Sequence, residues 1–423
     1  MAEERALDHY QRKSLPTELW KVIFSKVTHL PGKVEFAKQA SAHLKFPCAT
    51  QEGAANFYND EIRYIVGARL RIILVCKTWY ILGIADLYSH VWFNPESPSS
   101  DSLQFAFTRR PSALSDVKRL TVRAPRNYLL CDYSTLLERM EWVASLLSRL
   151  PQVRILQVSP EVAAILPMQK LSPTLEVVTI LRSPVNSSLP ILKHTISATV
   201  LEHTRVLLLD PVIFHRGMLK TQVHFQSVTH FALVSHRYPI DLRIIGLDRI
   251  LDNWALPNLQ TLVIEHVDWP TVSTLCRRHL DTLKSLHLDY SLMESGASNW
   301  QTETLGLPNL QEIKLKSCGN LFPFLNLDVV ALEMLEVLND RDIWPDLPQL
   351  LDLSPKLLAL ESYRISGHSY QGLLYVNPLL ENPGIVAQVA ALRDRGISVE
   401  VHWSECVDPA CQGQGKCFSP FGG

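Results

Sequence analysis

The feature that most constrains the fold is an apolar triplet at positions i, i+3 and i+5 that recurs along most of the chain. Successive starts lie 22 to 36 residues apart and average about 27, and they fall at Val117, Val153, Leu175, Thr204, Val228, Leu259, Leu283, Leu310, Leu332 and Leu357. Residues 256–260 and 307–311 both read Leu-Pro-Asn-Leu-Gln, which agrees with this period. A regular period of roughly 20–50 residues indicates a solenoid of stacked units.

The triplet spacing predicts a short strand in each unit. Alternate side chains of a strand share one face, so the i+3 and i+5 residues point inward together and the residues between them point outward. Helical stretches before two strands, residues 136–150 and 385–395, end at Pro151 and at Gly396, which we expect to be a left-handed cap. A final strand is expected to carry Ile397, Val399 and Val401.

A single unit cannot fold alone. Burying five large apolar side chains contributes about 10 kcal/mol, whereas ordering 27 residues costs about 40 kcal/mol. Units must therefore stack. The pattern resembles leucine-rich repeats, which implies an α/β solenoid with parallel strands on the concave face and helices on the convex face. Only Cys318 occupies the family's Asn/Cys position after the strand, so we expect an uneven arc. A doubly wound α/β protein is the alternative, but no phosphate-binding loop is present.

The N-terminal part reads differently. Residues 15–24 are Leu-Pro-Thr-Glu-Leu-Trp-Lys-Val-Ile-Phe, residues 74–80 are Leu-Val-Cys-Lys-Thr-Trp-Tyr, and Leu87-Tyr88 and Val91-Trp92 follow. Together these motifs resemble the F-box of fungal proteins that carry degenerate leucine-rich repeats. The resemblance implies that a Skp1-type adaptor, and through it a cullin, binds an apolar surface formed by Leu15, Pro16, Leu19, Ile23, Phe24, Leu74, Val75, Cys76 and Trp79. The alternative is that these side chains pack on the repeats as a helical cap.

The expected domain organisation follows from these motifs. A polar arm spans residues 1–14, the helical module spans 15–93 with an inserted loop at about 31–69, and a linker spans 94–102. About ten repeats fill 103–403, and a Cys- and Gly-rich tail fills 404–423. The inserted loop is longer than the compact module needs, and closing it costs little entropy.

The composition excludes several classes of function. The net charge of −1 gives no basic excess for nucleic acid or a membrane surface, and no apolar stretch reaches the ~20 residues of a membrane span. Eight dispersed cysteines in a chain without a signal peptide indicate reduced thiols and a cytoplasmic or nuclear location. His402 with Cys406, Cys411 and Cys417 lacks the tight pair typical of zinc sites, so we expect no metal or other cofactor.

No catalytic motif is present, and we expect a binding protein and not an enzyme. The outward residues of the strands are apolar in the middle of the array (Ile155, Val177, Leu208 and Val263) and charged at its ends. We expect either that they contact a protein substrate or that another part of the chain covers them. The candidate substrate contacts are Arg119, Arg123, His287, Asp289, Glu312, Lys314, Lys316 and Glu361. Two functions follow: a ubiquitin-ligase substrate receptor, or a repeat scaffold whose F-box is vestigial or independent of the ligase.

Overall fold

A computed structural model describes the chain over most of the repeat strands and over three parts of the N-terminal region. The described residues are 16–27, 70–94, 99–122, 133–159, 163, 174–180, 203–210, 223–233, 251–265, 269–289, 305–317, 327–339, 359–369 and 383–405.

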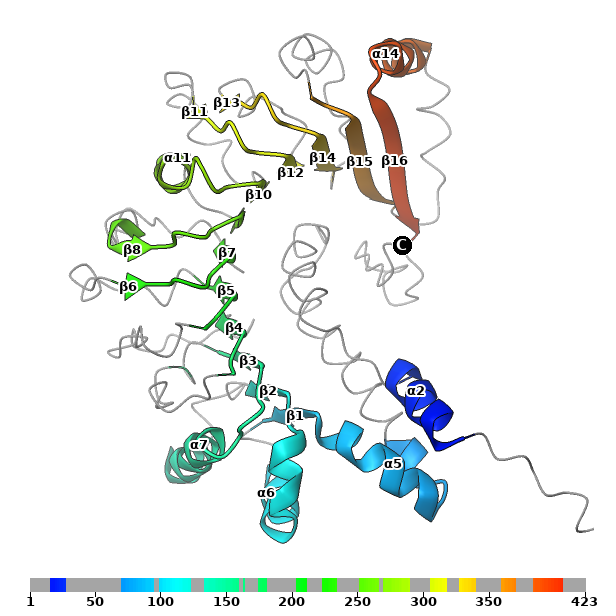
Figure 1. Ribbon diagram of the computed structural model, residues 1–423, viewed down its shortest axis with the longest axis vertical. Coiled ribbons are helices and arrows are strands. Elements are labelled where there is room, and N and C mark those ends of the chain that lie inside the picture. The colour runs from blue at the N-terminus through cyan, green and yellow to red at the C-terminus, as the bar shows by residue number, and fades with distance from the viewer. Residues whose placement is uncertain are drawn as a thin grey trace, which may run out of the picture.

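The centre of the molecule is one parallel sheet of twelve strands that follows an arc (Figure 1). Its strands, in spatial order, are β1 (His90–Phe93), β2 (Arg119–Val122), β3 (Ile155–Val158), β4 (Val177–Ile180), β5 (Val206–Leu209), β7 (His230–Leu233), β9 (Thr261–Glu265), β10 (Ser285–Asp289), β12 (Glu312–Ser317), β14 (Met334–Asn339), β15 (Ser362–Ser369) and β16 (Ser398–Glu405). The spatial order is the order along the chain, so each unit contacts mainly its neighbours, as in a solenoid.

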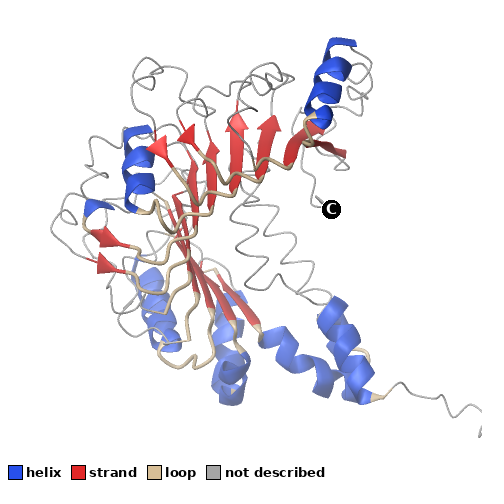
Figure 2. Ribbon diagram, turned by 45° about the horizontal axis from the view of Figure 1, so that its top comes forward, coloured by secondary structure: helices blue, strands red, loops and turns tan. Residues whose placement is uncertain are grey.

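Most helices and the very short strands lie on the outer side of this arc, whereas the helices of residues 17–27 and 77–88 lie beyond its N-terminal end (Figure 1 and Figure 2). The short strands pair as β6 (Val223–His224) with β8 (Trp254–Ala255), and as β11 (Leu305–Gly306) with β13 (Leu327–Asp328). The helices are α2 (Thr17–Val27), α5 (Lys77–Tyr88), α6 (Ser99–Arg109), the 3-10 helix η2 (Pro111–Asp116), α7 (Tyr133–Leu147), α11 (Trp269–Arg278) and α14 (Pro383–Asp394). The predicted α/β solenoid is therefore confirmed.

The triplet residues build the core between the sheet and the outer layer. In β10, for example, Leu286 and Leu288 are buried together with Leu283, which precedes the strand. The same three positions are buried in the units of β2, β3, β4, β5, β7, β9 and β12, and they join one continuous hydrophobic cluster. Shared burial across neighbouring units supplies the stability that one unit lacks.

Two predicted helices lie within three residues of their observed bounds, whereas two expected limits near the N-terminus differ from the structure. The helices expected at 136–150 and 385–395 are α7 and α14, and Gly396 has a φ of +83°, so it is the expected left-handed cap. The sheet, however, begins with β1, inside the range expected for the helical module, because His90–Phe93 pairs in register with β2. Helix α6 likewise begins at Ser99, within the expected linker.

Candidate functional surfaces

The N-terminal helices pack on one another through two tryptophans. The rings of Trp20 on α2 and Trp79 on α5 lie 4.7 Å apart between centroids. The carbonyl of Pro16 accepts hydrogen bonds from the first turn of α2, and Cys76 Sγ accepts one from the backbone N–H of Trp79 at the start of α5. These contacts fix the two helix starts, which contain the sequence motifs, beside each other.

A helical turn at residues 70–73 lies against α5 because residue 83 is a glycine. A Cβ placed on Gly83 would lie only 3.0 Å from Cγ2 of Ile73, so a larger residue would push the turn away. Ile73 and Ile84 are buried in this contact. Leu74 and Val75, which follow the turn, are left exposed.

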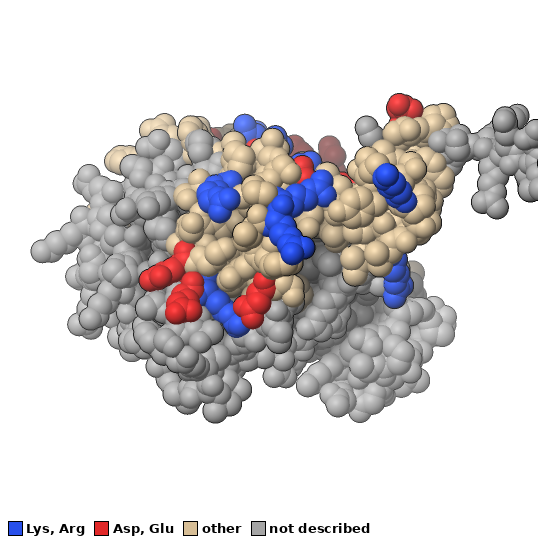
Figure 3. Space-filling view, turned by 90° about the horizontal axis from the view of Figure 1, so that it is seen from below, with Lys and Arg blue, Asp and Glu red and all other residues tan. Residues whose placement is uncertain are grey.

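The outer side of this helical unit is an apolar surface open to solvent. Its exposed side chains, which we call the module surface, are Leu19 (47% exposed), Val22 (51%), Ile23 (38%), Leu70 (45%), Leu74 (73%), Val75 (60%) and Ile81 (64%). Seen from below, the unit that contains α2 and α5 carries few charged side chains (Figure 3). Large apolar side chains gathered on a surface in this way mark a contact site for another molecule.

The predicted adaptor contacts fall into three groups. Pro16, Leu19, Ile23, Leu74, Val75 and Cys76 are exposed, and all belong to or border the module surface. Trp79 is half-buried against Trp20, so it also builds the unit itself. Leu15 and the side chain of Phe24 lie outside the described residues. The sequence motif did not include Val22, Leu70 and Ile81, which the structure shows to be exposed on the same helical unit.

Most described side chains on the inner face of the sheet are buried, and several, such as Gln157, His230 and Glu312, are half-buried. In its apolar middle, Ile155 is 7% exposed, Val177 0%, Leu208 1% and Val263 2%. At the N-terminal end, His90 Nε2 lies 3.1 Å from Thr121 Oγ1, and Arg119 Nη2 donates to Gln157 Oε1 over 3.2 Å. The inner face is therefore not an open docking surface in this structure.

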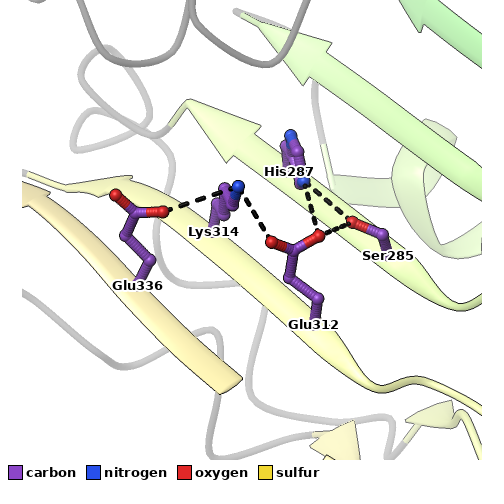
Figure 4. A network of polar contacts seen from close by, with 5 residues as sticks. All are labelled: Ser285, His287, Glu312, Lys314 and Glu336. Carbon is purple, nitrogen blue, oxygen red and sulfur yellow. Dashed lines mark hydrogen bonds and ion pairs between the residues drawn. The ribbon is translucent and has the colours of Figure 1, made fainter. Parts of the chain in front are cut away.

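A polar network crosses three strands of the same face at β10, β12 and β14 (Figure 4). Lys314 Nζ lies 2.8 Å from Glu312 Oε1 and 3.5 Å from Glu336 Oε2. On the other side, Ser285 Oγ donates to Glu312 Oε2 over 2.5 Å, and His287 Nε2 lies 2.8 Å from Ser285 Oγ. The parallel register places these residues on neighbouring strands with Cα partners Ser285–Glu312, His287–Lys314 and Lys314–Glu336.

The hydrogen bonds of this network run opposite to those of an activated nucleophile. The single hydroxyl hydrogen of Ser285 goes to Glu312, so His287 Nε2 carries a hydrogen and donates it. A general base would instead present an unprotonated nitrogen to the hydroxyl. Nδ1 of His287 is buried and has no hydrogen-bond partner among the described residues. Ser, His and Glu here form a structural network.

Burial sets the charge states in the network. Desolvation lowers the pKa of His287 and outweighs the hydrogen bond to Glu312, so the imidazole is neutral. Desolvation would raise the pKa of Glu312, but its hydrogen bond with His287 and the Lys314 ammonium lower this pKa well below its ordinary value. Glu312 and Lys314 are thus a charged pair beside a neutral histidine.

The structure shows how accessible the candidate substrate contacts are. Arg119, His287 and Lys314 are buried, so these three side chains are not available to a substrate in this structure. Glu312 keeps 24% of its side chain exposed. Glu361 is exposed but lies before β15 and not on the inner face, because the triplet of this unit starts at Leu360, three residues after the predicted Leu357. Register pairs Asp289 with Lys316 at the strand ends, but their side chains, and all of Arg123, lie outside the described residues.

A pocket of about 580 Å³ opens between β8 and the end of α11. Asp252 Oδ1 and Arg278 Nη2 form an ion pair of 2.6 Å on its wall, and the buried His279 also lines it. Desolvation, with a smaller contribution from the Arg278 charge, lowers the pKa of His279 to about 4. Beside it, burial raises the pKa of the Cys276 thiol to about 12, so this cysteine is unreactive. No sequence motif predicts this pocket, because its residues come from separate units.

Among the described residues, no helix has the length and hydropathy that a membrane crossing needs. The same residues contain no group of three or more His, Cys, Asp or Glu side chains placed to hold a metal ion. Cys406, Cys411 and Cys417 lie outside the described residues.

Comparison with known proteins gives a structural likeness only. No protein-family model matches the chain, and no curated protein matches it. Among solved structures, the chain is similar to the leucine-rich repeat-containing protein LegL7 from Legionella pneumophila, with 13% sequence identity and a TM-score of 0.40. That match covers 78% of this chain and 99% of the other.

Proposed function

We propose that this protein is a substrate receptor of a Skp1-cullin-F-box ubiquitin ligase. In this proposal the module surface binds a Skp1-type adaptor, and the repeats bind a protein target. The adaptor connects the receptor to a cullin, and other subunits transfer ubiquitin. The receptor would act by holding the target close to the transfer site, which raises its effective concentration there.

The observation that carries this proposal is the exposure of the motif residues. Leu74 and Val75 are 73% and 60% exposed, although both belong to an apolar sequence motif and lie beside a well-packed pair of helices. If the helical unit were only a cap for the repeats, burial against the sheet would be the expected fate of these side chains. The exposure of Leu74 and Val75 therefore argues against the alternative in which the helical unit only caps the repeats.

A co-expression pull-down with a Skp1-type adaptor tests the proposal. Leu74→Asp with Val75→Asp places two charges in the module surface and should abolish adaptor recovery. The matched control is Val330→Asp, because Val330 is similarly exposed (56%) but lies in a turn of a distant repeat. The control should keep adaptor recovery, and both variants should keep the far-UV circular dichroism of the parent.

The same experiment separates the two candidate functions. Recovery of the adaptor together with a cullin supports the ligase receptor. Recovery of the adaptor without a cullin supports a ligase-independent F-box on a repeat scaffold. If the parent protein recovers no adaptor, or if the double variant recovers as much as the control, adaptor binding through this surface is refuted.

A further inference from the structure

One row of side chains runs along the whole arc outside the buried inner face. It consists of the residue immediately before each strand from β2 to β15, and we call it the rim row. From the second member on, each backbone N–H of this row donates to the carbonyl of the previous member over 2.8 to 3.0 Å. Its members are Lys118, Arg154, Glu176, Arg205, Thr229, Gln260, Lys284, Gln311, Glu333 and Glu361.

The rim row is exposed where the inner face is not. Eight of its ten side chains are exposed, and Glu176 and Thr229 are half-buried. The adjacent inner-face positions are buried or half-buried: Arg119 next to Lys118 and Val206 next to Arg205 are buried, and Glu312 next to Gln311 is half-buried. The rim row is therefore the continuous line of strand-ordered side chains that the solenoid offers to a partner.

The charges of the row are not evenly mixed. Lys118, Arg205 and Lys284 are exposed cations, and none forms an ion pair within the described part of the chain. Arg154 lies 3.8 Å from Glu176, and its side chain remains 58% exposed. The negative members Glu333 and Glu361 follow at the other end, where Gln311 donates to Glu333 over 3.3 Å.

The three unpaired cations are evenly spaced. Three strand steps separate Lys118 on the β2 side from Arg205 on the β5 side, and three more separate Arg205 from Lys284 before β10. Neighbouring strands lie about 4.8 Å apart, so each interval is about 14 Å. In an extended polypeptide, residues four apart are also separated by about 14 Å and point to the same side.

From this match we propose that the rim row binds an extended acidic segment of a partner protein. Acidic side chains four residues apart would face Lys118, Arg205 and Lys284 in turn. Neutral Thr229 and Gln260 lie between the last two cations and accept uncharged partner residues. If the protein is a ligase receptor, this segment belongs to its target, but binding at the rim does not depend on the adaptor.

The charge pattern favours a protein segment over a nucleic acid. A phosphate backbone carries a negative charge at every nucleotide, so it would meet Glu176 within the cationic stretch and Glu333 beyond it. A peptide with separated carboxylates avoids both repulsions. The chain's net charge of −1 also opposes general attraction to a polyanion.

The test is a fluorescence-anisotropy titration with the full-length protein. The probe is a labelled peptide with Glu at every fourth position and Ser and Thr elsewhere. The triple variant Lys118→Glu/Arg205→Glu/Lys284→Glu should bind it at least about tenfold more weakly, because three attractive pairs become repulsive. The matched control is Glu333→Lys/Glu361→Lys on the same row, which should bind the probe as well as the parent or better.

Two results would overturn this proposal. One is equal affinity of parent and triple variant for the peptide. The other is tighter binding of a labelled single-stranded homopolymeric RNA, which would assign the surface to nucleic acid. The triple variant should keep adaptor recovery in the pull-down, because it leaves the module surface unchanged. A loss of peptide binding at the rim row and a loss of adaptor binding at the module surface can therefore be distinguished.

Discussion

The side chain of Asn309 donates a hydrogen bond from Nδ2 to the backbone carbonyl of Asp281 over 3.0 Å. Asn258, in the other copy of the Leu-Pro-Asn-Leu-Gln phrase, makes the same bond to the carbonyl of Gln226 over 2.7 Å. Each asparagine thus links the turn before its own strand to the turn of the preceding unit. In these two units, asparagine therefore links neighbouring repeats through the turn before the strand. Leucine-rich repeats place their linking Asn or Cys after the strand, a position that only Cys318 occupies in this sequence.

Replacing Asn309 with alanine should destabilise the repeat array modestly. The variant leaves the Asp281 carbonyl without its side-chain donor, and one such bond contributes about 1 kcal/mol. Urea unfolding followed by circular dichroism should detect this loss. Gln260→Ala is the control, because this exposed rim side chain forms no hydrogen bond within the described residues, and its stability should match the parent. Equal midpoints for both variants would contradict the role of Asn309.

Removing the central cation of the inner network should be more costly. Lys314→Met leaves Glu312 and Glu336 near each other without the ammonium that lies between them, and Glu336 is fully buried. Breaking a buried pair in this way costs about 3 kcal/mol. Adding Glu336→Leu to Lys314→Met should restore part of that loss, as a double-mutant cycle in urea would measure. Additive destabilisation would show that the two charges are not coupled.

Stability should fall as the pH drops below about 6.5 because of His279. Its pKa in the folded state is about 4, below the ordinary 6.5, so the unfolded chain binds a proton more readily. The neutral form's contribution is complete above the unfolded value and is lost as the pH falls from about 6.5 to about 4. His230 and His287, whose pKa values burial also lowers, act in the same direction.

The variant His279→Leu isolates this contribution. The free energy of unfolding, measured from pH 4 to pH 7, should depend less steeply on pH in the variant than in the parent. The change between the two ends should be smaller in the variant by up to about 3 kcal/mol. An unchanged slope would mean that folding does not lower the pKa of His279.

Removing Trp20 should loosen the first helix without unfolding the repeats. Trp20 packs on Trp79, and an aromatic pair contributes about 1 kcal/mol beyond its buried area. In Trp20→Ala, amide hydrogens of α2 should exchange faster while those of β9 and β10 keep their protection. Exchange that rises equally everywhere would indicate global destabilisation instead.

The sequence predicted the parts of the fold that depend on a local pattern. The triplets located ten strands, and Gly396 was identified as a cap because only glycine adopts its φ without strain. The pairs β6–β8 and β11–β13 were missed, since two residues carry no periodicity. Strand β1 was assigned to the helical module, because the tryptophan and tyrosine around it belong to the same motif.

Properties that depend on tertiary contacts were not predictable in the same way. Alternation identified the side of the sheet on which Arg119 and His287 lie, but whether that side is covered depends on residues far away in the chain. Glu361 was misplaced because the apolar pattern around it also fits a triplet that starts three residues too early, and any shift by an odd number of residues moves a side chain to the other face. The exposure of Leu74 was expected from the resemblance, whereas Val22 and Ile81 required the structure.

The most direct test of the central claim is a calorimetric titration of the purified protein with a Skp1-type adaptor at several temperatures. Burial of the module surface predicts saturable binding with a negative heat-capacity change. It also predicts that Leu74→Asp with Val75→Asp abolishes the heat of binding while Val330→Asp leaves it unchanged. Absence of binding to the folded parent protein, or equal binding by the double variant, would contradict the account.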